Sequence, residues 1–307
     1  MHSEPERPYN CMQEDRHGKT EGGRSLRKTT VKEQEKIIYI RPHYQWKWRQ
    51  IIADILQYKD LLYFLVVRDI KSKYAQSILG IGWAILNPLI NTLVFTVIFG
   101  NLAKVGSDGV PYLLFSFFAM VPWTYFSGIL TDATASMIRN RNLITKVYFP
   151  RLLLPLTVVI SRMVDFMIGM AVAVGLSLYY GIMPMQEIVW LPLIMLILIG
   201  SSLGGGILLS VMAVQFRDVN YALPSLIRVL MYAVPVVYPL SLIPSSYWHI
   251  YALNPMVGVI EGMRSIFLGT RPLPWDMIGE GALVTLILLV VAIYYFRKSE
   301  QQFADIV

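Results

Sequence analysis

Six long apolar stretches divide the chain, at residues 78–99, 112–131, 152–180, 188–214, 222–242 and 278–296. A helix needs about 20 apolar residues to cross the hydrocarbon core of a bilayer, and each stretch is about that long or longer. Polar segments separate the stretches. The pattern therefore predicts an all-α polytopic membrane protein whose residues 78–307 form a domain of six transmembrane helices.

Lysine and arginine residues are distributed unevenly between the two sets of gaps. Near the span ends on one side lie eleven of them: Arg68, Lys71, Lys73, Arg139, Arg141, Lys146, Arg151, Arg217, Arg228, Arg297 and Lys298. Near the span ends on the other side lie three: Lys104, Arg264 and Arg271. Because cytoplasmic loops carry the excess of basic residues, we expect both termini in the cytoplasm.

The residues before the first span fall into two parts. Residues 1–40 are polar and strongly charged, which predicts a disordered cytoplasmic tail. In residues 41–77 apolar positions recur at helical spacing, with Trp46 and Trp48 near the start and charged residues between them. This pattern predicts an amphipathic helix in the inner headgroup layer. A soluble helix that packs against a partner subunit is the alternative.

The composition argues against a soluble nucleic-acid-binding protein. The chain is 55% hydrophobic and 15% charged, whereas a soluble domain carries about 25% charged residues. Its net charge of +7 comes largely from residues beside the predicted spans, where anionic lipid headgroups attract basic side chains. We therefore expect membrane lipids as partners and no nucleic acid. The single cysteine, Cys11, excludes a disulfide within the chain.

Two segments outside the spans have unusual patterns. Residues 244–277 should lie outside the cell, yet they contain apolar runs that are too short to span, which predicts re-entrant outer helices between spans five and six. On the cytoplasmic side, basic and apolar residues alternate over 136–151. That alternation predicts a short helix under the bundle, with one face available to a soluble partner.

The sequence shows no catalytic or metal-binding constellation, so we expect a protein that is not an enzyme. Arg162 and Asp165 are ionisable residues inside the third span, three positions apart on one face. Such residues are candidates for function because a charge in hydrocarbon is costly. The pair either neutralises itself and orients the helix or contacts a passing anionic headgroup. Asp132, at the end of the second span, is expected to be a solvated helix end.

Several runs together resemble the membrane subunits of type-2 ABC exporters, in the branch that exports O-antigen, capsule or teichoic acid polysaccharides. The runs that carry the resemblance are 68–74, 77–88, 142–151, 217–219, 235–239 and 254–256, with Asp165, Glu261 and Arg264. The resemblance extends from about residue 58 to the C-terminus. Residues before 41 have no counterpart in it.

The resemblance implies a homodimer in the bacterial cytoplasmic (inner) membrane, with two soluble ATP-binding cassette subunits docked below it. ATP and Mg²⁺ would bind to those partners and no cofactor to this chain. The substrate would be a polyprenyl-pyrophosphate-linked polysaccharide. A drug or a smaller lipid is the alternative substrate within the same transporter class. A membrane-embedded glycosyltransferase or polymerase would need a catalytic loop that the sequence does not show, and a structural scaffold would leave Arg162 and Asp165 unexplained.

The resemblance also assigns expected roles to residues. Those expected to couple the chain to the ATPase subunit are Asn142, Leu143, Ile144, Lys146, Val147, Tyr148, Phe149 and Arg151. Those expected near the cytosolic entrance, where cationic donors suit a pyrophosphate, are Arg68, Lys71 and Lys73. Those expected at the outer gate are Trp248, Tyr251, Asn254, Glu261 and Arg264.

Overall fold

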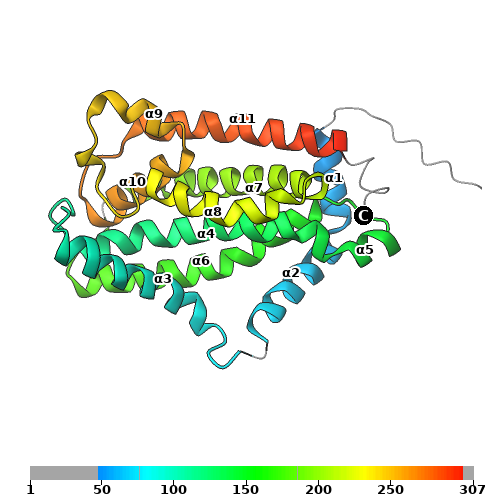
Figure 1. Ribbon diagram of the computed structural model, residues 1–307, viewed down its shortest axis with the longest axis horizontal. Helices are drawn as coiled ribbons and strands as arrows, with labels where there is room; N and C mark the ends of the chain where they lie inside the picture. The colour runs from blue at the N-terminus through cyan, green and yellow to red at the C-terminus, as the bar shows by residue number, and fades with distance from the viewer. Residues whose placement is uncertain (1–47, 76, 185, 300–307) are drawn as a thin grey trace, which may run out of the picture. The chain divides into compact units, whose positions relative to one another are not determined.

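The computed structural model describes residues 48–75, 77–184 and 186–299, and these ranges are largely helical (Figure 1). They contain eleven α-helices: α1 (Trp48–Gln57), α2 (Lys59–Tyr74), α3 (Gly82–Phe95), α4 (Tyr112–Arg139), α5 (Arg141–Lys146), α6 (Leu153–Tyr179), α7 (Leu191–Gln215), α8 (Asp218–Ala233), α9 (Trp248–Ala252), α10 (Pro255–Leu268) and α11 (Trp275–Ser299). A π-helix (Thr96–Leu102) continues α3, and short 3-10 helices occupy Gln186–Trp190, Leu240–Leu242 and Ser245–Tyr247.

Five helical segments of the described chain are long and apolar enough to cross a membrane. They are Gly82–Leu102, Tyr112–Arg139, Leu153–Tyr179, Glu187–Gln215 and Trp275–Ser299. Each overlaps one of the stretches predicted from the sequence. The all-α, multi-pass class is therefore confirmed for these five segments.

The stretch at 222–242 does not form one long helix as expected. Helix α8 has 16 residues, about 24 Å at 1.5 Å per residue, and ends at Ala233. Val234 then has extended backbone (φ −112°, ψ 145°). Pro235 explains the end of the helix, since a proline disfavours helical backbone at the residue before it. The remainder of the stretch is non-helical backbone and a 3-10 turn.

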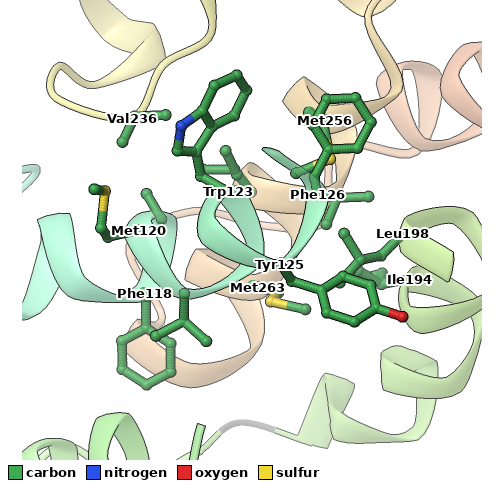
Figure 2. Packing of buried hydrophobic residues seen from close by; sticks show 14 of the residues in the cluster. Phe118, Met120, Trp123, Tyr125, Phe126, Ile194, Leu198, Val236, Met256 and Met263 are labelled. Carbon is green, nitrogen blue, oxygen red and sulfur yellow. The ribbon is translucent and has the colours of Figure 1, made fainter. Parts of the chain in front are cut away.

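Helix α4 lies at the centre of the packing and contacts α3, α6, α7, α8 and α10. In the most apolar part of α4, 78% of the residues are buried inside the protein. The corresponding share for the Gly82–Leu102 segment is 11%, so that segment lies at the periphery. Figure 2 shows Trp123 and Phe126 of α4 among side chains from α7, α10 and the segment after α8. Phe118 stacks on Phe267 of α10 with ring centroids 5.0 Å apart. These contacts fix the frame on which the peripheral helices pack.

Helix α7 packs between α4 and α11 through glycines on different faces. A Cβ at Gly200 would lie 2.8 Å from Thr285 Cγ2 of α11, and one at Gly206 would lie 3.0 Å from Ala133 Cβ of α4. Small residues at such positions let helix backbones approach closely. Close packing matters in lipid because no hydrophobic driving force holds one helix against another there.

The amphipathic segment before the first span forms two helices instead of one. Helices α1 and α2 meet at Tyr58, whose backbone (φ −101°, ψ 24°) departs from helical geometry. Helix α2 packs against α6. The predicted disordered tail, residues 1–40, and part of the segment 41–77 lie outside the described residues.

Residues 244–277 contain the two short helices expected there, α9 and α10. In α10 every residue from Met256 to Leu268 is buried, among α4, α7 and α11. Figure 1 shows α9 and α10 at one end of the long helices and α5 at the opposite end. Helix α10 and helix α5 therefore lie at opposite ends of the helix bundle (Figure 1).

Candidate functional site

A cleft of about 250 Å³ lies between α2, α3, α4 and α6. Its polar wall is formed by Lys73, Tyr74, Asn87, Thr124, Arg162 and Asp165. Its aromatic lining includes Trp83, Tyr125 and Phe166. A concave site with a few convergent polar groups among apolar and aromatic side chains is the usual form of a ligand site. We call it the charged cleft.

The ionisable side chains of the charged cleft form a continuous network. The Arg162 guanidinium donates to Asp132 Oδ2 from Nε at 2.8 Å and from Nη2 at 2.5 Å. Its Nη1 lies 3.8 Å from Asp165 Oδ2. Asp165 also accepts hydrogen bonds from Lys73 Nζ and from the Tyr74 hydroxyl. The network thus joins the end of α2 to α4 and α6.

This network changes two expectations from the sequence. The Arg162–Asp165 contact exists, but the closer partner of Arg162 is Asp132. Asp132 is therefore a member of the ion network, and the expectation that it is merely a solvated helix end is wrong. The reason is the length of α4, which continues to Arg139 and so places Asp132 within a helix and beside α6.

Gly128 of α4 leaves the space that the Arg162 guanidinium occupies. A Cβ at Gly128 would lie only 2.7 Å from Arg162 Nη1. Any larger residue there would push the guanidinium away from its present position. Sequence reasoning had no signal for this contact, nor for Tyr74 and Trp83 as members of one cleft, because the positions lie on different helices.

The α2 members of the cleft are electrostatically perturbed. Partial burial lowers the pKa of Lys73, the nearby positive charge of Arg162 lowers it further, and the contact with Asp165 opposes both effects. Burial and the hydrogen bond to Asp165 raise the pKa of the Tyr74 hydroxyl. Tyr74 therefore acts as a neutral hydrogen-bond donor near neutral pH.

The three residues expected at the entrance are not brought together. Lys73 lines the charged cleft, whereas Arg68 donates to Asn140 Oδ1 at 2.7 Å, at the junction of α4 and α5. Lys71 is exposed. Next to Arg68, Asp69 accepts a hydrogen bond of 2.9 Å from the Ser161 hydroxyl of α6. Helix α2 is thus attached by polar contacts both to α6 and to the start of α5.

The loop expected to couple to an ATPase forms the six-residue helix α5 followed by extended backbone at Val147. Its side chains divide into exposed and enclosed groups. Tyr148 is 79% exposed, and Asn142, Lys146 and Val147 are also exposed. Leu143, Ile144 and Arg151 are half-buried, and Phe149 is buried in a cluster with Leu65 and Met137. The loop is anchored on one face and accessible on the other.

The residues expected at an outer gate occupy different environments. Trp248 and Tyr251 are half-buried, and the Asn254 side chain caps α10 by accepting from the Met256 amide at 3.1 Å. Arg264 and Glu261, in contrast, form a fully enclosed ion pair at 2.8 Å. In this structure these two side chains do not line an accessible path.

Arg264 ties the segment after α8 to the core. Its guanidinium donates to the carbonyl oxygens of Pro235 at 2.7 Å and Val236 at 2.9 Å, and it lies over the Phe115 ring. The two carbonyls belong to non-helical backbone, which lacks the hydrogen bonds of a helix. Because buried carbonyls need partners, Arg264 stabilises the break after α8.

Comparison with known proteins places these features in a family. Residues 60–268 match the family described as ABC-2 type transporter. The O-antigen export system permease protein RfbA of Myxococcus xanthus is 31% identical over 258 residues, covering 83% of this chain and 98% of that protein. The polysialic acid transport protein KpsM of Escherichia coli is 26% identical, covering 77% of this chain and 92% of that protein.

A relative with a less specific description also matches. The inner membrane transport permease YadH of Escherichia coli (strain K12) is 27% identical over 256 residues, covering 76% of this chain and 93% of that protein. The family match covers more than half of the 307 residues and contains the charged cleft, α5 and the Glu261–Arg264 pair. The chain is a multi-pass membrane protein that belongs to the ABC-2 type transporter family.

Proposed function

We propose that the chain is the membrane-spanning permease subunit of an ABC transporter that exports a lipid-linked polysaccharide across the bacterial cytoplasmic membrane. The observation that carries this proposal is the similarity to RfbA and KpsM, described as O-antigen export and polysialic acid transport proteins, over more than three quarters of the chain. A substrate of O-antigen, capsule or teichoic acid type fits that similarity.

ATP hydrolysis belongs to partner subunits in this proposal, and α5 with the following residues is their docking site. The anchored and exposed faces of this loop support the role, because Phe149 fixes the loop while Tyr148 and Lys146 remain accessible. The Arg68–Asn140 hydrogen bond connects the docking site directly to α2, so a movement of α5 driven by the ATPase could be passed to α2. This chain binds no cofactor of its own, and the partner holds ATP and Mg²⁺.

One exposed face of α8 is polar, beside a second exposed face that carries Leu226 and Val229, and the polar face supports a homodimer with a polar path at its centre. Tyr221, Ser225, Arg228 and Tyr232 recur at helical spacing and are all exposed. The sequence pattern predicts Arg228 near a span end, but it lies ten residues into α8, about 15 Å from the start of the helix. A charge that faced lipid there would be costly. By contrast, the exposed face of α11 carries Leu283, Leu286 and Ile287. We infer that α11 faces lipid and that α8 faces the path.

We also propose a membrane arrangement. Helix α8 and the non-helical segment after it make the sixth crossing, α9 and α10 re-enter from the outside, and both termini are cytoplasmic. Irregular backbone at membrane depth requires burial in protein, and the buried Val234–Val237 segment meets that requirement. Labelling of Cys11, the single cysteine, by an impermeant reagent only after the membrane is opened would support this orientation.

The substrate assignment is tested with the chain and its ATPase subunits in proteoliposomes. We expect lipid-linked glycan to stimulate ATP hydrolysis and hydrophobic drugs to leave it unchanged. The Arg228→Leu variant tests the path in the same assay. It should keep the fold, because Arg228 is exposed, and reduce glycan-stimulated hydrolysis, because it removes a charge from the proposed path. Stimulation by drugs and none by glycan would overturn the polysaccharide assignment in favour of a permease for a drug or smaller lipid.

A further inference from the structure

The carboxylate of Asp165 occupies a position on which donors from two helices converge. It accepts from Lys73 Nζ and the Tyr74 hydroxyl of α2, and Arg162 Nη1 of α6 lies 3.8 Å away. Cationic and hydroxyl donors around one point are the arrangement that binds phosphate oxygens. In this structure a carboxylate of the chain itself fills that point.

The two carboxylates of the network have different relations to Arg162. Asp132 holds the guanidinium with two hydrogen bonds, at 2.5 and 2.8 Å. Asp165 lies beyond hydrogen-bond distance from it, and its side chain is 17% exposed at the cleft. Asp132 therefore positions the arginine, whereas Asp165 can leave its donors without disturbing that orientation.

The charge balance of the network also indicates that Asp165 must move before an anion can bind. Lys73 and Arg162 are matched by Asp165 and Asp132, and the more exposed Arg139 lies 4.0 Å from Asp132. An additional anion would therefore meet a carboxylate in its path and little excess positive charge within the cleft. If Asp165 turns to water, one positive charge is left for an incoming anion. The cavity of about 250 Å³ suits a small head group and not a polymer, because pockets for drug-sized ligands measure about 300–1,000 Å³.

We propose that the charged cleft is a phosphate-binding site whose anion position Asp165 occupies at rest. A phosphate group of a lipid-linked substrate displaces Asp165 and takes the donors of Lys73, Tyr74 and Arg162. When the phosphate departs, Asp165 returns and the site is neutral again. The identity of the phosphate as part of a lipid-linked glycan rests on the proposed function, whereas the exchange itself rests on the cleft.

The test is equilibrium binding of farnesyl diphosphate to the full-length chain in phosphatidylcholine nanodiscs, with farnesol as the uncharged control. Asp165→Asn removes the competing charge at the site and should tighten diphosphate binding by about tenfold, with farnesol binding unchanged. Asp69→Asn is the matched control. It removes one carboxylate from the α2–α6 contact outside the cleft and should change binding by no more than about twofold.

Lysine substitutions keep the test decisive if Asp165→Asn fails to fold. Lys73→Met should weaken diphosphate binding at least about tenfold, and Lys73→Arg should restore most of it. Equal or weaker binding by a folded Asp165→Asn, or unchanged binding by Lys73→Met, would overturn the proposal. Phosphatidylglycerol that competes with farnesyl diphosphate would identify ordinary lipid phosphate as the ligand and would still support the exchange. Failure of the proposed function is seen separately, in the glycan-stimulated hydrolysis.

Discussion

Two ion clusters in this molecule each pair an arginine with carboxylates but are enclosed to different degrees. The Glu261–Arg264 pair is sealed in the core, with side chains 5% and 1% exposed. The Lys73–Asp165–Arg162–Asp132 network borders a cleft, with side chains 17–33% exposed. Arg264 donates to backbone carbonyls as well as to Glu261, whereas Nη1 of Arg162 lies 3.8 Å from Asp165, beyond hydrogen-bond distance.

The difference in enclosure indicates a difference in role. A buried ion pair whose arginine also donates to backbone carbonyls holds a structure together. Breaking it leaves an uncompensated charge in a region of low dielectric. A partly exposed network contributes little to stability and leaves its groups able to exchange partners. The Glu261–Arg264 pair therefore stabilises the fold, whereas we propose the charged cleft as the part that acts in transport.

Arg264→Met should produce the largest loss of stability. The change leaves Glu261 buried without its cation and the Pro235 and Val236 carbonyls without their donor. We expect a loss of about 3–5 kcal/mol in the free energy of unfolding, measured by denaturation in detergent. An unfolding midpoint equal to that of the unmodified protein would contradict the structural role.

Glu261→Gln should cost less than Arg264→Met. The amide can still accept from Arg264. The guanidinium also keeps its bonds to the carbonyls of Pro235 at 2.7 Å, Val236 at 2.9 Å and Phe115 at 3.3 Å. The expected loss is about 1.5–3 kcal/mol, the range for a hydrogen bond to a charged group. The same denaturation measurement applies. A loss larger than that of Arg264→Met would show that the carboxylate, and not the arginine, holds the segment.

Arg162→Met is the matched substitution in the charged cleft and should separate stability from transport. Asp132 and Asp165 remain partly exposed after the change, so the expected loss of unfolding free energy is about 1 kcal/mol or less. Glycan-stimulated ATP hydrolysis by the assembled transporter should nevertheless fall by at least about tenfold. The opposite result would be a loss of unfolding free energy as large as that of Arg264→Met, with normal glycan-stimulated hydrolysis per folded molecule. It would show that Arg162 serves the fold and not transport.

Tyr148→Ala should have the smallest effect on stability, within about 0.5 kcal/mol, because the side chain is 79% exposed. It should still reduce co-purification of the ATPase subunits. Tyr179→Ala is the control, since Tyr179 is 84% exposed at the other end of the long helices. Equal retention of the ATPase subunits by both variants would remove α5 as the docking site.

The sequence predicts the fold better than the site, for a physical reason. Five spans could be located because apolar length is a local property, and α9 and α10 because their apolar runs are too short to span. The break at Ala233 was not predicted, although Pro235 is its cause. Burial of Arg264 was missed because a count of charges by loop treats every arginine as exposed.

The charged cleft could be predicted only in part. Arg162 and Asp165 are visible as charges in an apolar helix, and Lys73 belongs to a basic run. Their association with Asp132 depends on contacts between α4 and α6, over a separation of 30 residues, and on the space left by Gly128. Such contacts follow from helix rotation and packing, which hydropathy does not determine.

The most direct test of the central claim is depletion of this protein in its host, followed by extraction of lipid-linked glycans from the cell interior. The proposed function predicts that polyprenyl-linked polymer accumulates inside while the surface polysaccharide is lost, and that the unmodified gene but not the Arg162→Met variant restores export. An unchanged surface glycan with no internal accumulation would contradict polysaccharide export by this transporter.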